Sequence, residues 1–294
     1  TFVNTVLGET WEDEYASKIG ADFLMERAAT SIYRHTIPPA DVLALTVGCD
    51  VQDDRLSLSV WGWGREEQGW LIDRIKLYGS PSRLEVWKQL DQVLTTPYTN
   101  EADEPLRILC CAIDSGGHHT QEVYQYARDR SSIGVIAVKG IGQKGKPVLG
   151  KASKVDLNYQ GKALKKGALV FPVGVDGIKS LLFGRLKHNE VGPGYLHFYP
   201  TITPDYFEEL TAEKQILRFR NGFPERVWVK KSQAPNEALD EFNYAYAALH
   251  RLYQRWDRRT IWDQLERRNE PKQASPLRST QKTAAKRGNF VQSW

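Results

Sequence analysis

The feature that most restricts the fold of this sequence is a pair of alternating segments, residues 43–51 and 55–60, separated by a short polar turn. Apolar side chains with a period of two are typical of strands, and a turn this short predicts an antiparallel hairpin. The first strand ends in a carboxylate, Asp50, although a single Asp in that place is also typical of an ordinary turn. The alternating apolar residues are Leu43, Leu45, Val47, Leu56, Leu58 and Val60.

The segment after the hairpin predicts one more strand and then a helix. Residues 70–77 form an alternating run that follows a second polar turn, so three successive antiparallel strands are expected. Ser82 with Glu85 three residues later is the pattern of a capping box, which predicts a helix that begins there.

A continuous apolar run over residues 106–113 predicts a strand covered on both faces, and this run stops at Asp114. A helix over residues 120–130 and a buried strand over residues 134–138 follow. This order predicts an α/β fold with a ribonuclease H-like mixed five-stranded sheet flanked by helices, followed by an added β-hairpin or loop excursion. In that topology the first and fourth strands are neighbours, so Asp50 and Asp114 would end adjacent strands at the same edge.

The most regular helical pattern covers residues 236–256, where Asn236 follows Pro235 and is expected to be the N-cap. Apolar side chains spaced by three and four residues predict one stripe that faces the core. Asp240 lies beside this stripe in the first turn. The stripe consists of Leu239, Phe242, Tyr246, Leu249, Tyr253 and Trp256.

Asp50, Asp114 and Asp240 therefore lie at the ends of elements that the fold would bring together. Carboxylates that converge in a partly buried site repel one another unless a cation holds them, and hard oxygen ligands favour Mg²⁺ or Mn²⁺. Two such ions could activate water for phosphodiester hydrolysis, with Glu241 as a candidate fourth ligand. The alternative is structural: two turn residues and one acid favoured by the macrodipole at a helix start.

Other polar residues near these positions have simpler interpretations. Asp53 and Asp54 are expected to form the hairpin turn, and His118 and His119 to lie exposed in a loop. The segment GIGQKGKP, residues 140–147, nearly matches a phosphate-binding loop of nucleotide-binding proteins, but a proline replaces the hydroxyl that would bind magnesium. We therefore expect no nucleotide site there.

Charge and composition point to a polyanionic partner. Residues 139–166 hold eight lysines and one acid, and residues 251–294 hold eleven Lys or Arg and four acids, in a chain whose net charge is only +4. Basic segments on an acidic body suggest binding to double-stranded DNA, although solvated surface is the alternative. The lysines expected to contact DNA are Lys139, Lys144, Lys146, Lys151 and Lys154.

The 294 residues, 41% of them hydrophobic, suffice for one large core. No apolar run approaches the length of a membrane span, and three cysteines without CxxC spacing predict buried free thiols rather than a zinc site. We expect a lead-in or linker over residues 1–40, a nuclease domain over residues 41–268 and a basic, disordered tail over residues 269–294.

The chain resembles the C-terminal nuclease domain of large terminase subunits from lambda-like tailed phages. The resemblance extends over about residues 4–250, and the family pattern has metal-binding acids at the positions of Asp50, Asp114 and Asp240. The similar stretches are NTVLGETWE, VGCDVQDDRLSLSVWGWG, AIDSGGHHTQEVYQYA, GYLHFYP, YFEELTAE and PNEALDEFNYAYAAL.

This resemblance implies a metal-dependent endonuclease that cuts concatemeric viral DNA. It also implies a preceding ATPase domain, a terminase small subunit and a portal protein as partners, and action in the host cytoplasm, transiently at the procapsid portal. Two alternatives remain. One is a junction resolvase or transposase of the same fold, and the other is a docking module without catalysis, which binds DNA or portal.

Overall fold

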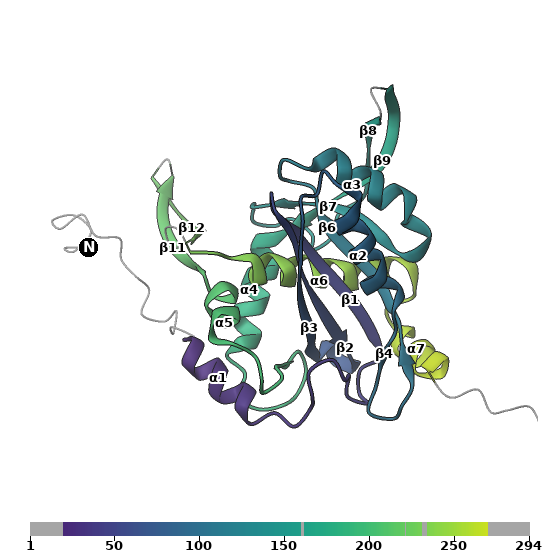
Figure 1. Ribbon diagram of the computed structural model, residues 1–294. Helices are drawn as coiled ribbons and strands as arrows, with labels where there is room; N and C mark the ends of the chain where they lie inside the picture. The colour runs from purple at the N-terminus through teal and green to yellow at the C-terminus, as the bar shows by residue number, and fades with distance from the viewer. Residues whose placement is uncertain (1–19, 160–161, 221, 231–233, 270–294) are drawn as a thin grey trace, which may run out of the picture.

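The strand that ends in Asp50 lies at the centre of an eight-stranded mixed sheet (Figure 1). The computed structural model describes residues 20–159, 162–220, 222–230 and 234–269. The strand order is β10-β3-β2-β1-β6-β7-β9-β8. These strands are β1 (Ala44–Val51), β2 (Arg55–Trp63), β3 (Gly69–Tyr78), β6 (Ile108–Asp114), β7 (Val135–Ile141), β8 (Ser153–Tyr159), β9 (Lys162–Gly174) and β10 (Leu196–His197).

The five central strands have the predicted ribonuclease H-like arrangement. β1 and β2 pair antiparallel, β2 and β3 pair antiparallel, and β1, β6 and β7 run parallel to one another. The sheet is larger than the predicted five strands, because the two-residue strand β10 extends one edge and β9 and β8 extend the other. Cys49 on β1 lies opposite Ile113 on β6, and Asp50 and Asp114 are the next residues on the two strands.

Helices lie on both faces of the sheet (Figure 1). Two pairs of strands are separate from it, and each forms a short antiparallel sheet of its own. The helices are α1 (Ala21–Ala29), α2 (Leu84–Thr95), α3 (Thr120–Asp129), α4 (Val175–Leu186), α5 (Pro204–Leu210), α6 (Glu237–Arg255) and α7 (Ile261–Asn269). The separate strands are β4 (Tyr98–Thr99), β5 (Pro105–Leu106), β11 (Glu213–Arg220) and β12 (Phe223–Lys230).

Helix α6 packs directly on β1 because Gly48 allows the two backbones to touch. A Cβ atom at Gly48 would lie 1.8 Å from the carbonyl oxygen of Glu241 and 2.4 Å from the amide nitrogen of Ala245. Thr46 on the same strand donates from Oγ1 to the carbonyl oxygen of Ala245 at 2.9 Å. This close approach brings the first turn of α6 beside the end of β1.

Aromatic side chains fill the space between the sheet and α6. Trp61 and Trp63 are fully buried, and their rings lie 5.0 and 6.3 Å from that of Phe242 on the helix. Trp70 is also buried. The three cysteines are free and buried, as predicted.

Two predicted helix caps differ from the structure. Helix α2 begins at Leu84 after Arg83, with no side-chain cap, and the capping box is wrong because Ser82 lies in the preceding turn. Asn236 does precede α6, as predicted, but its side chain makes no cap hydrogen bond to the helix backbone. It is bonded to acidic side chains instead.

The ends of the predicted domain division are only partly covered. Within residues 1–40, helix α1 packs on the core through the fully buried Leu24 and Ala28. The proposed tail lies outside the described residues except for position 269. No helix in the described part of the chain has the length and apolar character needed to cross a membrane.

Candidate metal and nucleic-acid site

The carboxyl ends of β1 and β6 form one wall of an open cavity of about 480 Å³. Asp50 and Asp114 line this cavity, together with Lys139 from the end of β7 and Tyr244 from α6. Parallel strands end at the same edge of a sheet, so the two acids are brought together by the topology that their positions in the sequence predicted. The remaining lining residues are Val51, Gln52, Asp53, Gly116, Gly117, His118 and Gly140.

Asp50 is the most deeply buried of the three predicted acids, with 6% of its surface exposed. Burial raises the pKa of its carboxyl to about 8, and the negative charges of Asp240 and Asp114 contribute to this increase. A hydrogen bond that Gln52 donates to Oδ2 opposes the shift. The carboxylate form of Asp50 is therefore costly unless a cation compensates it.

Asp114 is held by the loop that follows β6. The amide of Gly116 donates to its Oδ1 at 3.1 Å, and the hydroxyl of Tyr244 also bonds to its carboxylate. Burial raises the pKa of Asp114, while these hydrogen bonds and the charge of Lys139 lower it. The charged form of Asp114 is thus supported both by hydrogen-bond donors and by a nearby cation.

Asp240 lies in the first turn of α6, beside the cavity-lining residue Tyr244 on the same helix, and is not itself among the residues that line the cavity. The pKa of its carboxyl is raised to about 7, mainly by burial and also by the charges of Glu213 and Asp114, while the ammonium of Lys179 acts to lower it. Asn236, one helical turn earlier, donates from Nδ2 to Oδ2 of Asp240 at 2.9 Å. The charge of Asp240 thus raises the pKa of Asp50, and the charge of Asp114 raises the pKa of both Asp50 and Asp240.

Tyr244 lies among the three acids. Its hydroxyl is buried, and burial together with the charges of Asp114, Asp240 and Asp50 raises its pKa well above the ordinary value. A neutral phenol at this position donates a hydrogen bond to Asp114. The helical spacing that put Asp240 and Tyr244 on one line of α6 was visible in the sequence, but it gave Tyr244 no assigned role.

Glu241 has a different environment from Asp240. Its carboxylate is fully buried, accepts a hydrogen bond from Ser57 Oγ at 2.6 Å and a second from Ser59, and forms an ion pair with Arg74 at 3.3 Å. Glu241 could bind a metal ion only if these bonds were broken. The role of Glu241 as a fourth ligand stays a prediction.

The other acids and histidines near the site lie at its rim. His118 is exposed and its Nδ1 lies 3.0 Å from Oδ1 of Asp53, while Asp54 is paired with Arg55 at 2.8 Å. Both acids lie in the β1–β2 turn, as predicted, whereas the prediction of an exposed His119 is wrong because its side chain is partly buried. The lysine-rich segment after β7 leads into the strand β8.

The five predicted DNA-contacting lysines are all exposed. They lie on the end of β7, on the segment that joins it to β8 and on β8 itself, next to the cavity at Lys139. Their contact with DNA stays a prediction. These lysines are Lys139, Lys144, Lys146, Lys151 and Lys154.

The residues present fit a divalent cation by the chemistry of their donors. Burial and mutual repulsion disfavour three carboxylates at once, and a hard cation removes both costs. In the described part of the chain, no three His, Cys, Asp or Glu side chains already form a metal-binding cluster. A cation would therefore have to draw these carboxylates closer together.

Comparison with known proteins gives concordant results. Residues 1–262 match the family model "Terminase large subunit gpA, endonuclease domain". The large terminase subunits of Escherichia phage lambda and Enterobacteria phage P21 are 34% and 32% identical to this chain over 266 residues. Each alignment covers 87% of this chain and 39% of the relative, so the chain spans about two fifths of the length of these relatives.

A solved structure is also similar. It is the nuclease domain of the g2p large terminase from bacteriophage SPP1 with bound Mn, which is 13% identical and has a TM-score of 0.33. The match covers 78% of this chain and 92% of that chain.

Proposed function

Because this chain belongs to the family of terminase large subunit endonuclease domains, we propose that it cuts concatemeric viral DNA by metal-dependent phosphodiester hydrolysis. The observation that carries this proposal is the convergence of Asp50, Asp114 and Asp240 from β1, β6 and α6. Asp50 is buried and Asp114 and Asp240 are half-buried, and this burial disfavours their charged forms in the absence of a cation. Their arrangement suits a site that gains its stability on binding cations.

Asp50, Asp114 and Asp240 would hold Mg²⁺ or Mn²⁺. Two such ions, when bound, would supply activation of water and stabilisation of the leaving 3′ oxygen. The residues around them have separate tasks. Gln52 and the amide of Gly116 orient the carboxylates of Asp50 and Asp114 through the hydrogen bonds described above.

The basic segment after β7 would bind the sugar–phosphate backbone. Lys139 lies at the cavity, so a phosphate bound by its ammonium group would stand close to Asp50 and Asp114. The other exposed lysines extend this positive surface away from the site towards β8. Such contacts are independent of sequence, so we expect the isolated domain to bind DNA weakly and with strong dependence on salt.

The larger assembly belongs to the same proposal. By resemblance, a preceding ATPase domain would drive DNA into the procapsid through the portal protein, and the terminase small subunit would be a further partner. The protein would act in the host cytoplasm. These partners concern the full-length relatives, of which this chain corresponds to about two fifths.

The test is plasmid cleavage with Mn²⁺, Mg²⁺ or EDTA by the wild type and by Asp50→Asn, Asp114→Asn and Asp240→Asn. We expect nicking and linearisation that need the metal and are lost in each variant, while Mn²⁺ titration by calorimetry shows weakened binding in each. Asp22→Asn, an exposed acid on α1, is the matched control.

Retention of activity in one variant would remove that residue from the site. DNA binding without any cleavage, in every metal, would favour the docking function over the nuclease. Cleavage restricted to branched junctions would favour a resolvase.

A further inference from the structure

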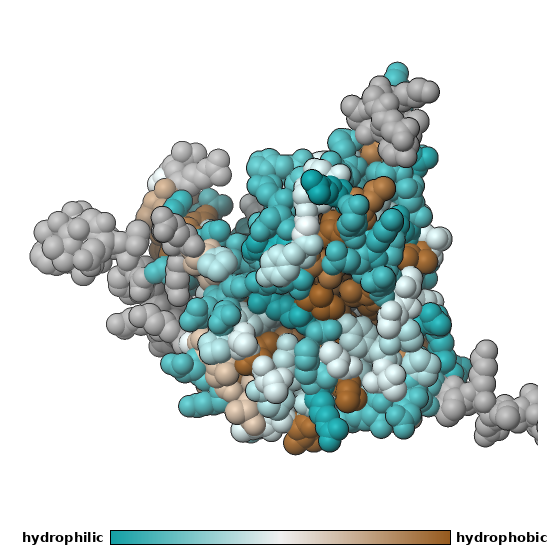
Figure 2. All heavy atoms as spheres, in the orientation of Figure 1, coloured by the Kyte–Doolittle hydropathy of each residue, from teal (hydrophilic) through white to brown (hydrophobic). Residues whose placement is uncertain are grey.

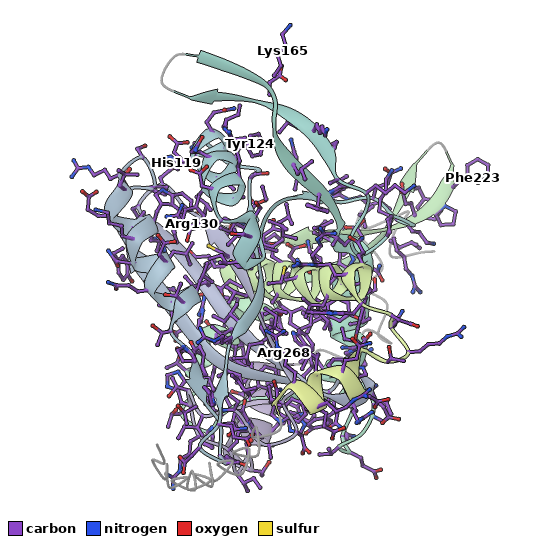
Figure 3. The ribbon with its side chains drawn as sticks, turned by 90° about the vertical axis from the view of Figure 1, so that its right-hand side faces the viewer. His119, Tyr124, Arg130, Lys165, Phe223 and Arg268 are labelled. Atoms are coloured by element: carbon purple, nitrogen blue, oxygen red, sulfur yellow. The ribbon has the colours of Figure 1, made fainter. Side chains whose placement is uncertain are left out.

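The hairpin formed by β11 and β12 projects from the body of the molecule. Its register runs from the pair Glu213–Lys230 at the base to the pair Arg220–Phe223 at the tip. In Figures 1 and 3 it extends from the same end of the molecule as the β8–β9 hairpin, while α1 and α7 lie at the opposite end. The ring of Trp228 contacts that of Phe183 on α4 at 5.0 Å and fixes the hairpin to the body.

The tip of this hairpin exposes two aromatic rings. Phe219 is 66% exposed and Phe223 is 77% exposed, and Figure 3 shows Phe223 pointing away from the body. Phe219 pairs with Pro224 and Phe223 with the next residue along β11, so the two rings lie on opposite faces of the ribbon. Single exposed apolar residues are common, but a pair on both faces of one tip points to a binding role.

Basic residues surround these rings. Residues 214–230 contain five Lys or Arg and one acid, Glu225, and Arg218 is exposed beside Phe219. Figure 2 shows hydrophilic and apolar atoms side by side on this hairpin. A ligand that suits both features carries negative charge and offers flat apolar surfaces. Nucleic acid has this chemistry, since phosphates meet the cations and bases meet the rings.

The base of the hairpin is bonded to the candidate site. Lys230 Nζ lies 3.4 Å from Oδ1 of Asn236, whose Nδ2 lies 3.3 Å from Oε1 of Glu213. The same Nδ2 donates to Asp240 at 2.9 Å. Glu213 is anchored in turn by the buried ammonium of Lys179 at 2.7 Å. Both strands of the hairpin therefore reach Asp240 through one side chain.

We propose that the β11–β12 hairpin is a DNA-binding arm that contacts the duplex being cut. Arg218 binds a phosphate, and the tip enters a groove, where Phe219 and Phe223 make apolar contacts with the DNA on the two sides of the ribbon. The duplex then lies against the candidate site between this arm and the lysine-rich segment after β7. That the bound DNA is the substrate rests on the proposed nuclease function. The arm itself is tested by DNA binding alone.

The experiment measures fluorescence anisotropy of a short labelled duplex with the whole chain in EDTA, at salt from about 50 to 200 mM. Phe219→Ala combined with Phe223→Ala is expected to weaken binding at least about fivefold at every salt concentration, with an unchanged salt slope. Arg218→Ala is expected to reduce the slope of log K against log salt by about 0.9.

Two controls match these variants. Leu84→Ala removes a side chain that is 72% exposed on α2, and Arg107→Ala removes an exposed cation at the start of β6, the end of that strand opposite Asp114. Neither is expected to change affinity or slope. Circular dichroism of each variant verifies folding.

The outcomes separate the arm from the nuclease. If the double Phe variant binds DNA in EDTA as tightly as the wild type does, the proposed arm is wrong, even if metal-dependent cleavage is present. Absence of DNA binding by the wild type also overturns it. Loss of affinity in the Phe variant, with no cleavage by the wild type in any metal, supports the arm and contradicts the nuclease.

Discussion

Asn236 donates a hydrogen bond from Nδ2 to Oδ2 of Asp240, 2.9 Å away, across the first turn of α6. Asn236 is thereby a positioning residue for the acid that enters the site from the helix. Its own side chain is held from both strands of the β11–β12 hairpin, by Glu213 and by Lys230.

Replacement of this amide tests its role. Asn236→Ala should slow plasmid cleavage about two- to tenfold, the equivalent of one net hydrogen bond of about 0.5–1.5 kcal/mol. The melting temperature should change little, since Asn236 makes no cap bond to the helix backbone. The apparent Mn²⁺ affinity should fall together with the rate. The control is Gln264→Ala on the remote α7, which removes the hydrogen bond that the Gln264 amide donates to Thr260. This variant should leave the cleavage rate and the Mn²⁺ affinity unchanged.

Stability without metal should depend on the protonation of Asp50. Its folded pKa of about 8 lies above the unfolded value, so the folded state binds a proton that the unfolded chain releases. This contribution is present below about pH 4 and is lost as pH rises towards 8. Asp50→Asn should therefore be more stable than the wild type at pH 8 by more than about 1.4 kcal/mol, the equivalent of one pKa unit.

The measurement for this prediction is urea unfolding in EDTA between pH 5 and 8, where the gap between variant and wild type should grow with pH. Mn²⁺ should stabilise the wild type most at the high end of this range, because its ligands must lose their protons to bind. A gap that is constant with pH would show that burial does not hold Asp50 protonated.

The close approach of β1 and α6 should tolerate no added atom. Gly48→Ala places a Cβ 1.8 Å from a backbone oxygen of the helix, and neither backbone can move away cheaply. We expect destabilisation by about 3 kcal/mol or more, the upper end of overpacking effects, with loss of cleavage.

Denaturant unfolding measures this change, and another glycine provides the matched comparison. Gly184 lies within α4 with open space around its Cβ position, so Gly184→Ala should stabilise the protein by about 0.5–1 kcal/mol. Equal effects of the two substitutions would contradict the close approach at Gly48.

Lysines near the cavity should set the salt dependence of DNA binding. Each of Lys139→Ala, Lys144→Ala and Lys146→Ala should reduce the slope of log K against log salt by about 0.9, because each removes one cation that binds a phosphate. Lys187→Ala removes an exposed lysine at the C-terminal end of α4, and this variant should keep the wild-type slope. Wild-type affinity that stays flat across the salt titration would exclude binding to the phosphate backbone.

The sequence could place Asp50 and Asp114 because strand order alone decides which strand ends meet. Two short turns and two helical crossovers put β1 beside β6, and both acids follow apolar runs that are easy to recognise. Asp240 could be located by the 3.6-residue period of α6. These three assignments need only local patterns and the rules of strand connection.

The surroundings of Asp240 could not be derived in this way. Lys179 and Glu213 lie on α4 and β11, and their ion pair depends on how distant elements pack. Helical period also does not reveal which of two consecutive acids faces the site. The structure bonds Glu241 to Ser57, Ser59 and Arg74, which come from strands far away in the sequence.

The three acids differ in the structural elements that hold them in place. Asp50 and Asp114 stand at the ends of adjacent strands, where a shift would break a ladder of backbone bonds. Asp240 stands on a helix start that is joined to a projecting hairpin through Asn236. A load on the hairpin would therefore reach Asp240 through Asn236 and leave Asp50 and Asp114 in place, so DNA bound by the proposed arm would act on one of the three acids alone.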